Sequence, residues 1–144
     1  MTVYIMRGIP GSGKSSWIAN NLDRGLVCSA DNFFMVDGEY RFNPAKLPEA
    51  HKACLRFFVE LFDDSFVGDI IVDNTNTQLW ELTPYLAFAE MKGHSVELIH
   101  IQCPVDVAAA RNTHGVPKKA IEAMAARYEK PLPWWNQREV EFKA

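Results

Sequence analysis

The sequence lacks any apolar run long enough to cross a membrane. A membrane-spanning helix needs roughly 18 or more consecutive apolar residues, and no stretch of this 144-residue chain approaches that length. The apolar stretch Thr2–Met6 is too short for the core of a signal peptide, and glycine and proline follow it at once. We therefore expect a globular protein without a membrane partner, of a length that suits one domain with a single core.

The sequence also has few cysteines and no excess of positive charge. The three cysteines Cys28, Cys54 and Cys103 are odd in number and far apart in the sequence. This spacing argues against a disulfide framework and against a zinc knuckle, and it favours a reducing cytoplasm. The net charge of −3 provides no overall attraction to nucleic acid or to an anionic membrane. A polynucleotide would therefore have to be held by a local basic patch.

Short apolar runs alternate with helical patterns along the chain. Four runs are typical of strands: Val3–Met6, Leu26–Cys28, Ile70–Val72 and Val96–Ile101. The first three lack polar alternation, as strands that are buried on both faces do. The fourth carries Glu97 and His100, which favours a position at the edge of a sheet. Strands that alternate with helices predict an α/β fold with a parallel sheet and right-handed crossovers.

Five helices are predicted between and after these runs. They cover the phosphate loop to Gly25, Ala45–Ser65, a segment that ends at Gly93, Pro104–Asn112, and a segment that begins at Pro117. His51 falls on the apolar stripe of the second helix and is interpreted as a core histidine. In the third helix, Pro84 favours the first turn with Thr83 as its cap.

The residues after position 130 form a separate tail. Two prolines, Pro131 and Pro133, end the last helix. Residues 131–144 are the only segment that we expect to be loosely attached, and we expect them to pack on the domain formed by residues 1–130. Trp134 and Trp135 are interpreted as a packing clamp for this tail in preference to a stacking surface for a base.

The segment Gly8-Ile9-Pro10-Gly11-Ser12-Gly13-Lys14-Ser15 matches the pattern GxxxxGK[ST] and lies between a predicted strand and a predicted helix. Its glycines let backbone N–H groups surround a phosphate, and the helix that follows directs its positive end at the same anion. Lys14 supplies a charge for the β- and γ-phosphates, and Ser15 offers a hydroxyl to magnesium. The sequence therefore predicts a site for a purine nucleoside triphosphate, namely ATP with Mg²⁺. We expect this site to include Ser16 as well.

Two aspartates follow neighbouring predicted strands. In a parallel sheet, ligands bind beyond the carboxyl ends of the strands, so Asp31 and Asp73 are expected near the phosphate loop. Asp31 is interpreted as the base that accepts the proton of an attacking hydroxyl, or else as the cap of the turn that follows it. Asp73 is interpreted as a magnesium ligand or a partner of Ser15, or else as part of a turn with Asn74 and Asn76.

Arg111 lies between the fourth and fifth predicted helices, in a segment that we interpret as a lid over residues 111–117. A cation on such a segment can meet the charge of a phosphoryl-transfer transition state. An arginine also suits the last turn of a helix, so spacing alone leaves both interpretations open. Lys118 and Lys119 would join a basic rim if the lid closed over a polynucleotide.

Several segments resemble known P-loop kinases. Residues 7–17 are similar to the phosphate loop of phage polynucleotide 5′-kinase. Further matches indicate a sister group, the P-loop kinase-like domains of Nedd-four-binding-protein-two-like proteins. They are Ser29–Phe34, Tyr40–Pro44 with Ala50-His51, Val72–Thr77, Trp80–Leu82, Pro84-Tyr85, Arg111-Asn112 with His114–Val116, and Met124 with Arg127–Glu129. Together they span residues 3 to 130.

The resemblance implies a three-layer P-loop fold with sheet order 2-3-1-4, helices on both faces, and ATP as the phosphoryl donor. It also implies that Asp31 is the general base toward a 5′-hydroxyl and that Arg111 belongs to an arginine lid. The chain departs from the phage enzyme where that enzyme has a second lid arginine, since His114 stands near this position. It also has Phe33-Phe34-Met35 where the phage enzyme carries a basic residue, and Asn32 where that enzyme has its second acidic residue.

We therefore predict an ATP- and Mg²⁺-dependent kinase in which Lys14, Asp31 and Arg111 take part in transfer to a hydroxyl. The preferred acceptor is the 5′-OH end of a nucleic acid. A small hydroxyl compound such as a nucleoside is the first alternative, favoured by the acidic net charge and the missing basic residue. The second alternative is a module that binds ATP as a switch and phosphorylates nothing.

Overall fold

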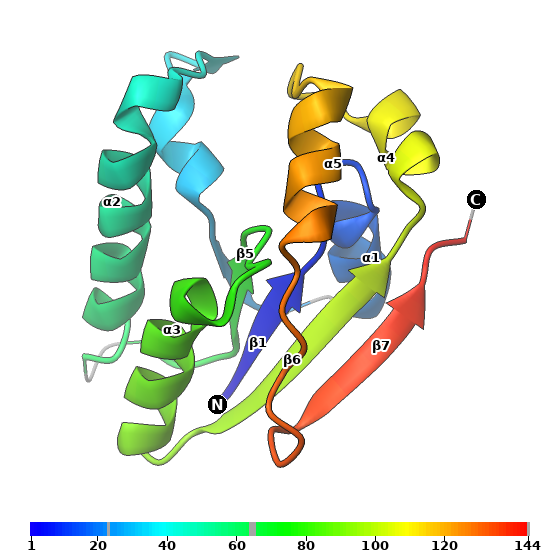
Figure 1. Ribbon diagram of the computed structural model, residues 1–144. Helices are drawn as coiled ribbons and strands as arrows, with labels where there is room; N and C mark the ends of the chain where they lie inside the picture. Colours follow the sequence, from blue (N-terminus) through cyan, green and yellow to red (C-terminus); the bar gives the residue numbers. More distant parts are fainter. Residues whose placement is uncertain (23, 64–65, 144) are drawn as a thin grey trace.

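A five-stranded parallel sheet forms the centre of the molecule (Figure 1). The computed structural model describes residues 1–22, 24–63 and 66–143. The strands of this sheet are β1 (Thr2–Arg7), β2 (Leu26–Cys28), β5 (Ile70–Asp73), β6 (Ser95–Gln102) and β7 (Gln137–Glu141). Their order is β2-β5-β1-β6-β7, and every neighbouring pair is parallel. The carboxyl ends of all five strands therefore lie at one edge.

Helices cover both faces of this sheet (Figure 1). They are α1 (Lys14–Asn21), α2 (Leu47–Glu60), α3 (Leu79–Met91), α4 (Val105–Arg111) and α5 (Lys118–Ala126). Two 3₁₀ helices, η1 (Ala30–Phe34) and η2 (Pro44–Lys46), flank a small hairpin of β3 (Met35–Val36) and β4 (Glu39–Tyr40). No helix in the described ranges has the length and apolar character that a membrane crossing requires.

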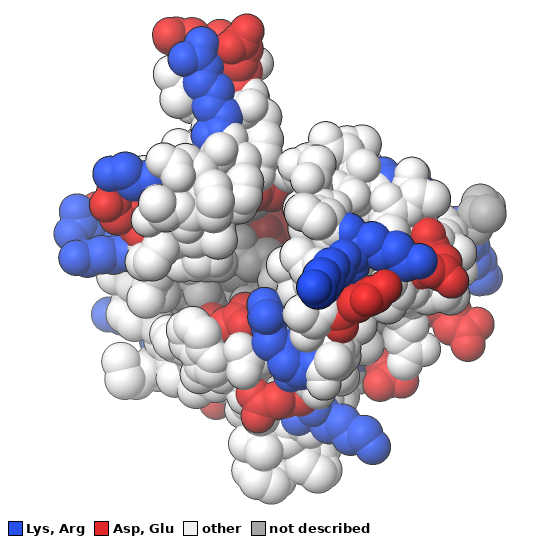
Figure 2. All heavy atoms as spheres, turned by 45° about the horizontal axis from the view of Figure 1, so that its top comes forward, with Lys and Arg blue, Asp and Glu red and all other residues white. Residues whose placement is uncertain are grey.

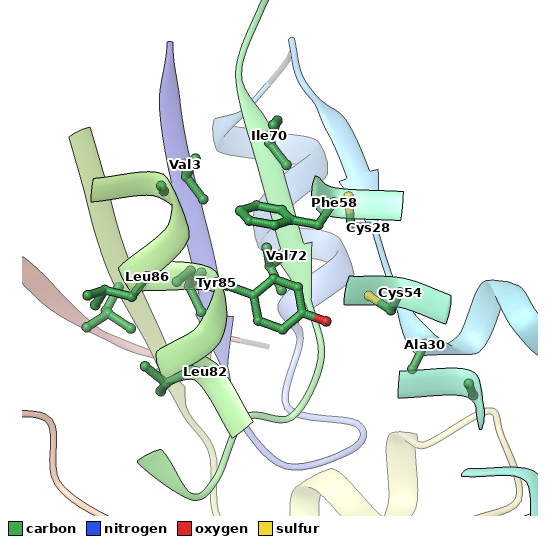
Figure 3. Close-up of a cluster of buried hydrophobic side chains, with 14 of the residues drawn as sticks. Val3, Cys28, Ala30, Cys54, Phe58, Ile70, Val72, Leu82, Tyr85 and Leu86 are labelled. Atoms are coloured by element: carbon green, nitrogen blue, oxygen red, sulfur yellow. The ribbon is translucent and has the colours of Figure 1, made fainter. Parts of the chain in front are cut away.

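Alternate residues of the strands enter different cores. On one face, Val3, Ile70 and Val72 pack with Phe58 of α2 and Tyr85 of α3. Figure 3 shows the Phe58 and Tyr85 rings against these strands, with Cys28 and Cys54 nearby. On the opposite face, a separate cluster contains Met6, Ile18, Ile71, Ile99 and Ile101, so that α1 covers this side. Burial on both faces explains why the residues between the ends of β1, and those of β5 before Asp73, are apolar.

The predicted order of the first four strands is confirmed, but the sheet has a fifth strand that the sequence did not indicate. β7 comes from the tail and pairs with β6, so β6 is not an edge strand and the tail is not loosely attached. The polar residues of β6 are partners of β7: Arg138 donates to Glu97, and the Gln102 amide donates to Glu139 at 2.8 Å. Cross-strand pairing of this kind makes a polar segment a stable strand.

Other helix boundaries differ from the prediction. Helix α2 ends at Glu60, and the predicted end at Ser65 lies outside the described residues. His51 is exposed on α2 and not in the core. Helix α3 begins at Leu79, so Pro84 lies inside the helix and Thr83 is not a cap; its hydroxyl donates to the Leu79 carbonyl.

The cause of the early start of α3 is a distant acid, because a Glu129 carboxylate oxygen accepts the Leu79 N–H at 3.0 Å. The end of this helix is as predicted, with Gly93 at φ +80°. At the tail, Trp134 is 76% exposed, whereas Trp135 packs against the larger core. The predicted packing role of the two tryptophans is therefore confirmed for Trp135 and wrong for Trp134.

The side chain of Arg7 joins three segments below the phosphate loop. It is 1% exposed. Its guanidinium donates to the carbonyls of Asn76, Thr77 and Glu129 and to the Tyr128 hydroxyl, at 2.7 to 3.1 Å. Burial lowers the pKa of Arg7, and the surrounding oxygens stabilise its charge. One side chain thus connects the end of β1 to the loop after β5 and to the segment after α5.

His100 lies next to this guanidinium. Its ring stacks on Tyr128 with centroids 4.4 Å apart, and Nδ1 has no hydrogen-bond partner in the part of the chain that the structure describes. Burial, together with the positive charge of Arg7, lowers the pKa of His100 to about 4. The imidazole is therefore neutral in the folded protein near neutral pH.

We expect Arg7→Met to lower the free energy of unfolding by about 3–5 kcal/mol, because three buried carbonyls lose their donor. Chemical denaturation measures this change. Arg41→Met is the control, since Arg41 is exposed and pairs with the exposed Glu39, and it should cost less than about 1 kcal/mol. Similar losses for both variants would contradict the role of Arg7 as an anchor.

We also expect His100 to make stability depend on pH. Its folded pKa of about 4 lies below the ordinary value of 6.5, so between these values the unfolded chain binds a proton that the folded chain does not. Stability should therefore fall as the pH drops from 6.5 toward 4, by about 2 kcal/mol at pH 5. The measurement is urea unfolding of wild type and His100→Gln at pH 7.5 and 5. An equal difference between the two proteins at both pH values would contradict this expectation.

Candidate functional site

The phosphate loop runs from the end of β1 to the first turn of α1. Its first N–H, that of Gly8, donates to the Thr75 carbonyl at 3.0 Å, which ties the loop to the segment after β5. Gly11 and Gly13 have φ values of +81° and +100°, which favour glycine. A Cβ on Gly11 would also overlap the carbonyl of Ala108 in α4. The two glycines thus permit both the loop conformation and the close approach of α4.

Lys14 lies inside this loop. Its Nζ donates to the carbonyls of Gly8 at 2.8 Å and Ile9 at 3.2 Å. Burial lowers the pKa of Lys14, and the negative charges of Asp73 and Asp31 act in the opposite direction. The lysine and both aspartates are therefore electrostatic neighbours, as the carboxyl-end rule predicts.

The serines of the loop differ in exposure. Ser15 and Ser16 are exposed on the first turn of α1, whereas Ser12 is fully buried. The Ser12 hydroxyl has no hydrogen-bond partner within the described ranges, and it lies across the loop from Gly8, whose added Cβ would approach it to 2.6 Å. Buried polar groups normally have a partner, so this hydroxyl is free to bond to a group in the loop.

Asp31 lies in η1, directly after β2. The cap of η1 is Ser29, whose hydroxyl accepts the Asp31 N–H at 3.2 Å, so the interpretation of Asp31 as a cap is wrong. Its carboxylate is held from two sides. Oδ1 accepts the Tyr40 hydroxyl at 3.2 Å, and Oδ2 lies 3.4 Å from Nδ1 of His114. These contacts orient the carboxylate at the strand-end edge of the sheet.

Tyr40 and His114 also contact each other. Their ring centroids are 4.5 Å apart. Burial, followed by the negative charge of Asp31, raises the pKa of Tyr40 to about 12, so its hydroxyl remains a donor. The sequence assigned no role to either residue. The only signal was their presence in the segments that resemble P-loop kinases.

Asp73 ends β5 beside Lys14. Burial raises its pKa, while the nearby Lys14 lowers it and Asp31 raises it further. Within the described ranges no hydrogen bond joins Asp73 to Ser15. The interpretation as a turn applies instead to the two asparagines: Asn74 accepts the Ala30 N–H, and Asn76 donates to the Met6 carbonyl, each at 2.9 Å. The asparagines fix the ends of the strands, and Asp73 lies within electrostatic reach of Lys14.

Arg111 occupies the last turn of α4 and reaches the phosphate loop. Its Nη1 donates to the Gly11 carbonyl at 3.1 Å, and its guanidinium lies 4.3 Å from the ring centroid of Phe142. Phe142 follows β7, and its N–H donates to the Gln102 carbonyl at 2.7 Å. A Cβ on Gly13 would lie 3.0 Å from the Phe142 ring. The sequence missed Phe142, because only the pairing of β7 brings it to the loop.

The segment between α4 and α5 is closed by Asn112, whose side chain donates to and accepts from the backbone of Val116, at 3.0 Å in each case. His114 lies within this closed segment. Lys118 does not form part of a free basic rim, since it pairs with Asp106 at 2.6 Å. Within this segment, His114 contacts Asp31 through its imidazole.

Figure 2 shows the surface at the carboxyl ends of the strands. It is hollowed, acidic atoms are visible in the depth of the hollow, and much of its wall is uncharged. The contact between Asp31 and His114 joins η1 to the segment between α4 and α5. The combination of a glycine-rich anion loop, a partly buried lysine and two carboxylates can bind a polyphosphate and accept a proton beside it.

Comparison with known proteins agrees with this geometry. A family model described as an AAA domain matches residues 3–131. NEDD4-binding protein 2 from Homo sapiens is 34% identical over 139 residues, which cover 90% of this chain and 8% of that protein. The chain therefore spans less than a tenth of that relative.

Solved structures share the fold. A gluconokinase from Sinorhizobium meliloti 1021 has a TM-score of 0.66 and 15% identity, with 99% of this chain and 83% of that chain covered. A chain of the Pnkp1/Rnl/Hen1 complex has a TM-score of 0.58 and 22% identity, with 76% and 38% covered. The chain belongs to the AAA domain family, and its fold is that of the P-loop kinases.

Proposed function

We propose that this chain is an ATP- and Mg²⁺-dependent kinase that transfers the γ-phosphoryl group of ATP to a hydroxyl. The observation that carries the proposal is the position of Asp31. Its carboxylate is held by Tyr40 and His114 and interacts electrostatically with Lys14 of the phosphate loop. A positioned base beside a phosphate site is what transfer to a hydroxyl needs.

The donor half of the proposed site is the phosphate loop. Backbone N–H groups from Gly8 to Ser16 would surround the phosphates, with Gly11 and Gly13 leaving room for them and Pro10 and Ser12 completing the loop. Lys14 would move from the carbonyls of Gly8 and Ile9 to the β- and γ-phosphates. Such a move exchanges two neutral acceptors for charged ones and is therefore favourable.

The residues present also fit a magnesium ion bound with the nucleotide. Ser15 presents an exposed hydroxyl at the start of α1, and Asp73 is a partly buried carboxylate beside Lys14. Oxygen ligands of this kind are the ones that Mg²⁺ prefers. Ser15 and Asp73 would hold the ion, which when bound neutralises charge on the β- and γ-phosphates.

The acceptor half of the proposed site is Asp31. The acceptor oxygen forms a bond to the γ-phosphorus, the bond from that phosphorus to the β,γ-bridging oxygen breaks, and ADP leaves. The proton of the acceptor hydroxyl passes to the Asp31 carboxylate. Tyr40 and His114 act as positioning residues, because each contacts one oxygen of this carboxylate.

Arg111 supplies positive charge in this proposal. It already contacts the phosphate loop through the Gly11 carbonyl, and residues 111–117 would act as the lid that carries it. A guanidinium near the transferred group stabilises charge that develops in the transition state. Phe142 holds this guanidinium from the other side through a cation–π contact.

The preferred acceptor is the 5′-OH end of a nucleic acid. This choice is supported by the segments that resemble polynucleotide 5′-kinase and by the similarity to a chain of the Pnkp1/Rnl/Hen1 complex. A small hydroxyl compound is the second candidate. It is favoured by the pairing of Arg41 with Glu39 and of Lys118 with Asp106, which leaves fewer free cations. The three free cysteines suit the reducing cytoplasm as the location.

The test uses ATP labelled in the γ-position with 5′-OH oligonucleotides and small hydroxyl compounds as acceptors. We expect transfer by the wild type and a fall in kcat of about 10²–10⁴-fold in Asp31→Asn and Asp31→Ala, because the base is lost. Asp37→Asn is the matched control: it changes an exposed aspartate of the neighbouring hairpin and preserves its backbone conformation, and it should retain activity.

Two results would overturn the proposal. One is the absence of transfer to every acceptor by a wild-type protein that binds ATP. The other is undiminished transfer by Asp31→Ala.

A further inference from the structure

Three aromatic residues next to Asp31, namely Phe33, Tyr40 and Phe42, form a surface that we call the aromatic wall. All three surround the buried ring of Phe34, with centroids 5.4, 6.1 and 5.1 Å from it. Tyr40 and Phe42 are stacked, with an interplanar angle of 19°. Phe34 is 3% exposed, whereas Phe33 and Phe42 are 41% and 45% exposed. Phe34 therefore anchors a set of rings of which two keep much of their surface in solvent.

The aromatic wall ends at the carboxylate that the proposed reaction uses. Tyr40 donates its hydroxyl to Asp31, and its ring touches the imidazole of His114. The exposed rings of Phe33 and Phe42 are thus connected to Asp31 through direct contacts with Phe34 and Tyr40. A molecule that places a hydroxyl at Asp31 has this apolar surface within its reach.

The charges around the aromatic wall do not favour a phosphate chain. The segment from Asp31 to Lys46 contains two cations, and both are paired: Arg41 with Glu39 at 2.9 Å and Lys46 with Glu49 at 3.4 Å. Two further exposed residues of the hairpin, Met35 and Val36, are apolar. Proteins that hold nucleic acid by its backbone need free lysine or arginine, whereas stacking on aromatic rings needs none.

We propose that the aromatic wall binds the base of the acceptor, so that the acceptor is a nucleoside or the terminal nucleoside of a nucleic acid, recognised by stacking and not through its phosphates. This inference rests on the proposed function, since it assigns the acceptor of the same site. In a nucleoside only the sugar separates the 5′-hydroxyl from the base. The hydroxyl can therefore contact Asp31 while the base lies on the exposed rings. A sugar acid or other compound without an aromatic ring leaves these rings unused.

The test compares two 5′-OH dinucleotides that differ only in the first residue, which either carries a base or is abasic. A free nucleoside and gluconate are added to separate the sources of the hydroxyl. We expect the abasic acceptor to have a KM about tenfold higher or more with little change in kcat, because stacking contributes to binding and not to proton transfer. Gluconate should be a poor acceptor, and the KM of the free nucleoside should be close to that of the base-carrying dinucleotide.

Variants connect this difference to the aromatic wall. Phe42→Ala and Phe33→Ala should raise KM for the base-carrying acceptor about tenfold and leave KM for the abasic acceptor unchanged. Phe42→Leu keeps an apolar side chain without a ring and should behave like Phe42→Ala. The control is Trp134→Ala, an exposed aromatic residue of the tail, which should change neither value. KM for ATP, unchanged in all variants, excludes general misfolding.

Salt dependence provides an independent measurement. Between 50 and 200 mM salt, several phosphate contacts would lower affinity about a thousandfold. We expect kcat/KM for a longer 5′-OH oligonucleotide, which offers many phosphates, to change only a few-fold over this range. Equal KM values for base-carrying and abasic acceptors, equal effects of Phe42→Ala on both, or a steep salt dependence would each overturn the proposal.

Binding without turnover separates this proposal from the proposed function. Nuclear magnetic resonance of the protein with a non-hydrolysable ATP analogue reports whether a nucleoside shifts the His114 and Tyr40 signals. If no acceptor is phosphorylated but the nucleoside binds and Phe42→Ala weakens its binding, the proposed kinase function is wrong and base binding by the aromatic wall is supported. If the protein binds the ATP analogue but the nucleoside shifts no signal, the aromatic wall is refuted.

Discussion

The buried guanidinium of Arg7 is the interaction on which the geometry of this molecule depends. Taking a charge out of water is costly, and it is tolerated here because three carbonyl oxygens from two segments and a tyrosine hydroxyl surround it. These acceptors belong to the loop after β5 and the segment after α5, so the guanidinium holds both of them at the end of β1. Their relative positions determine where the phosphate loop begins, since Gly8 follows Arg7 directly and donates to the Thr75 carbonyl.

The candidate site is assembled next to this guanidinium from segments that are distant in the sequence. Asn74 and Asn76 tie the loop after β5 to Ala30 and Met6, so that three strand ends are held together. This arrangement places Lys14, Asp31 and Asp73 within electrostatic reach of one another. The three groups depend on each other: burial alone would favour a neutral lysine and a neutral Asp73, and the opposite charges counteract this effect.

The tail and the segment between α4 and α5 complete the site from the other side. Each part contributes one side chain: Phe142 packs on Arg111, and His114 contacts Asp31 and Tyr40. The polar strand β7 is what brings Phe142 to the loop. Its pairing with β6 includes the hydrogen bonds from Arg138 to Glu97 and from Gln102 to Glu139, and Val140 packs against the core that α1 covers.

The sequence by itself determined the phosphate loop, the α/β class and the ends of helices such as that at Gly93, whereas the order of four strands was implied only by the resemblance to P-loop kinases. These features are encoded in local patterns: glycine where φ is positive, apolar runs where strands are buried on both faces, and proline or glycine at helix ends. The position of Asp31 and Asp73 beside Lys14 was also predictable, because it follows from the carboxyl-end rule for parallel sheets.

Only the tertiary structure decided the features that need a distant partner. Helix α3 begins at Leu79 because Glu129 caps it, β7 is a strand because β6 offers charged partners, and His51 is exposed although its spacing favoured the core. In the same way, Tyr40, His114 and Phe142 acquire a place in the site through contacts with residues far along the chain. Periodicity describes which face of an element is buried, but it carries no information on which remote side chain will meet that face.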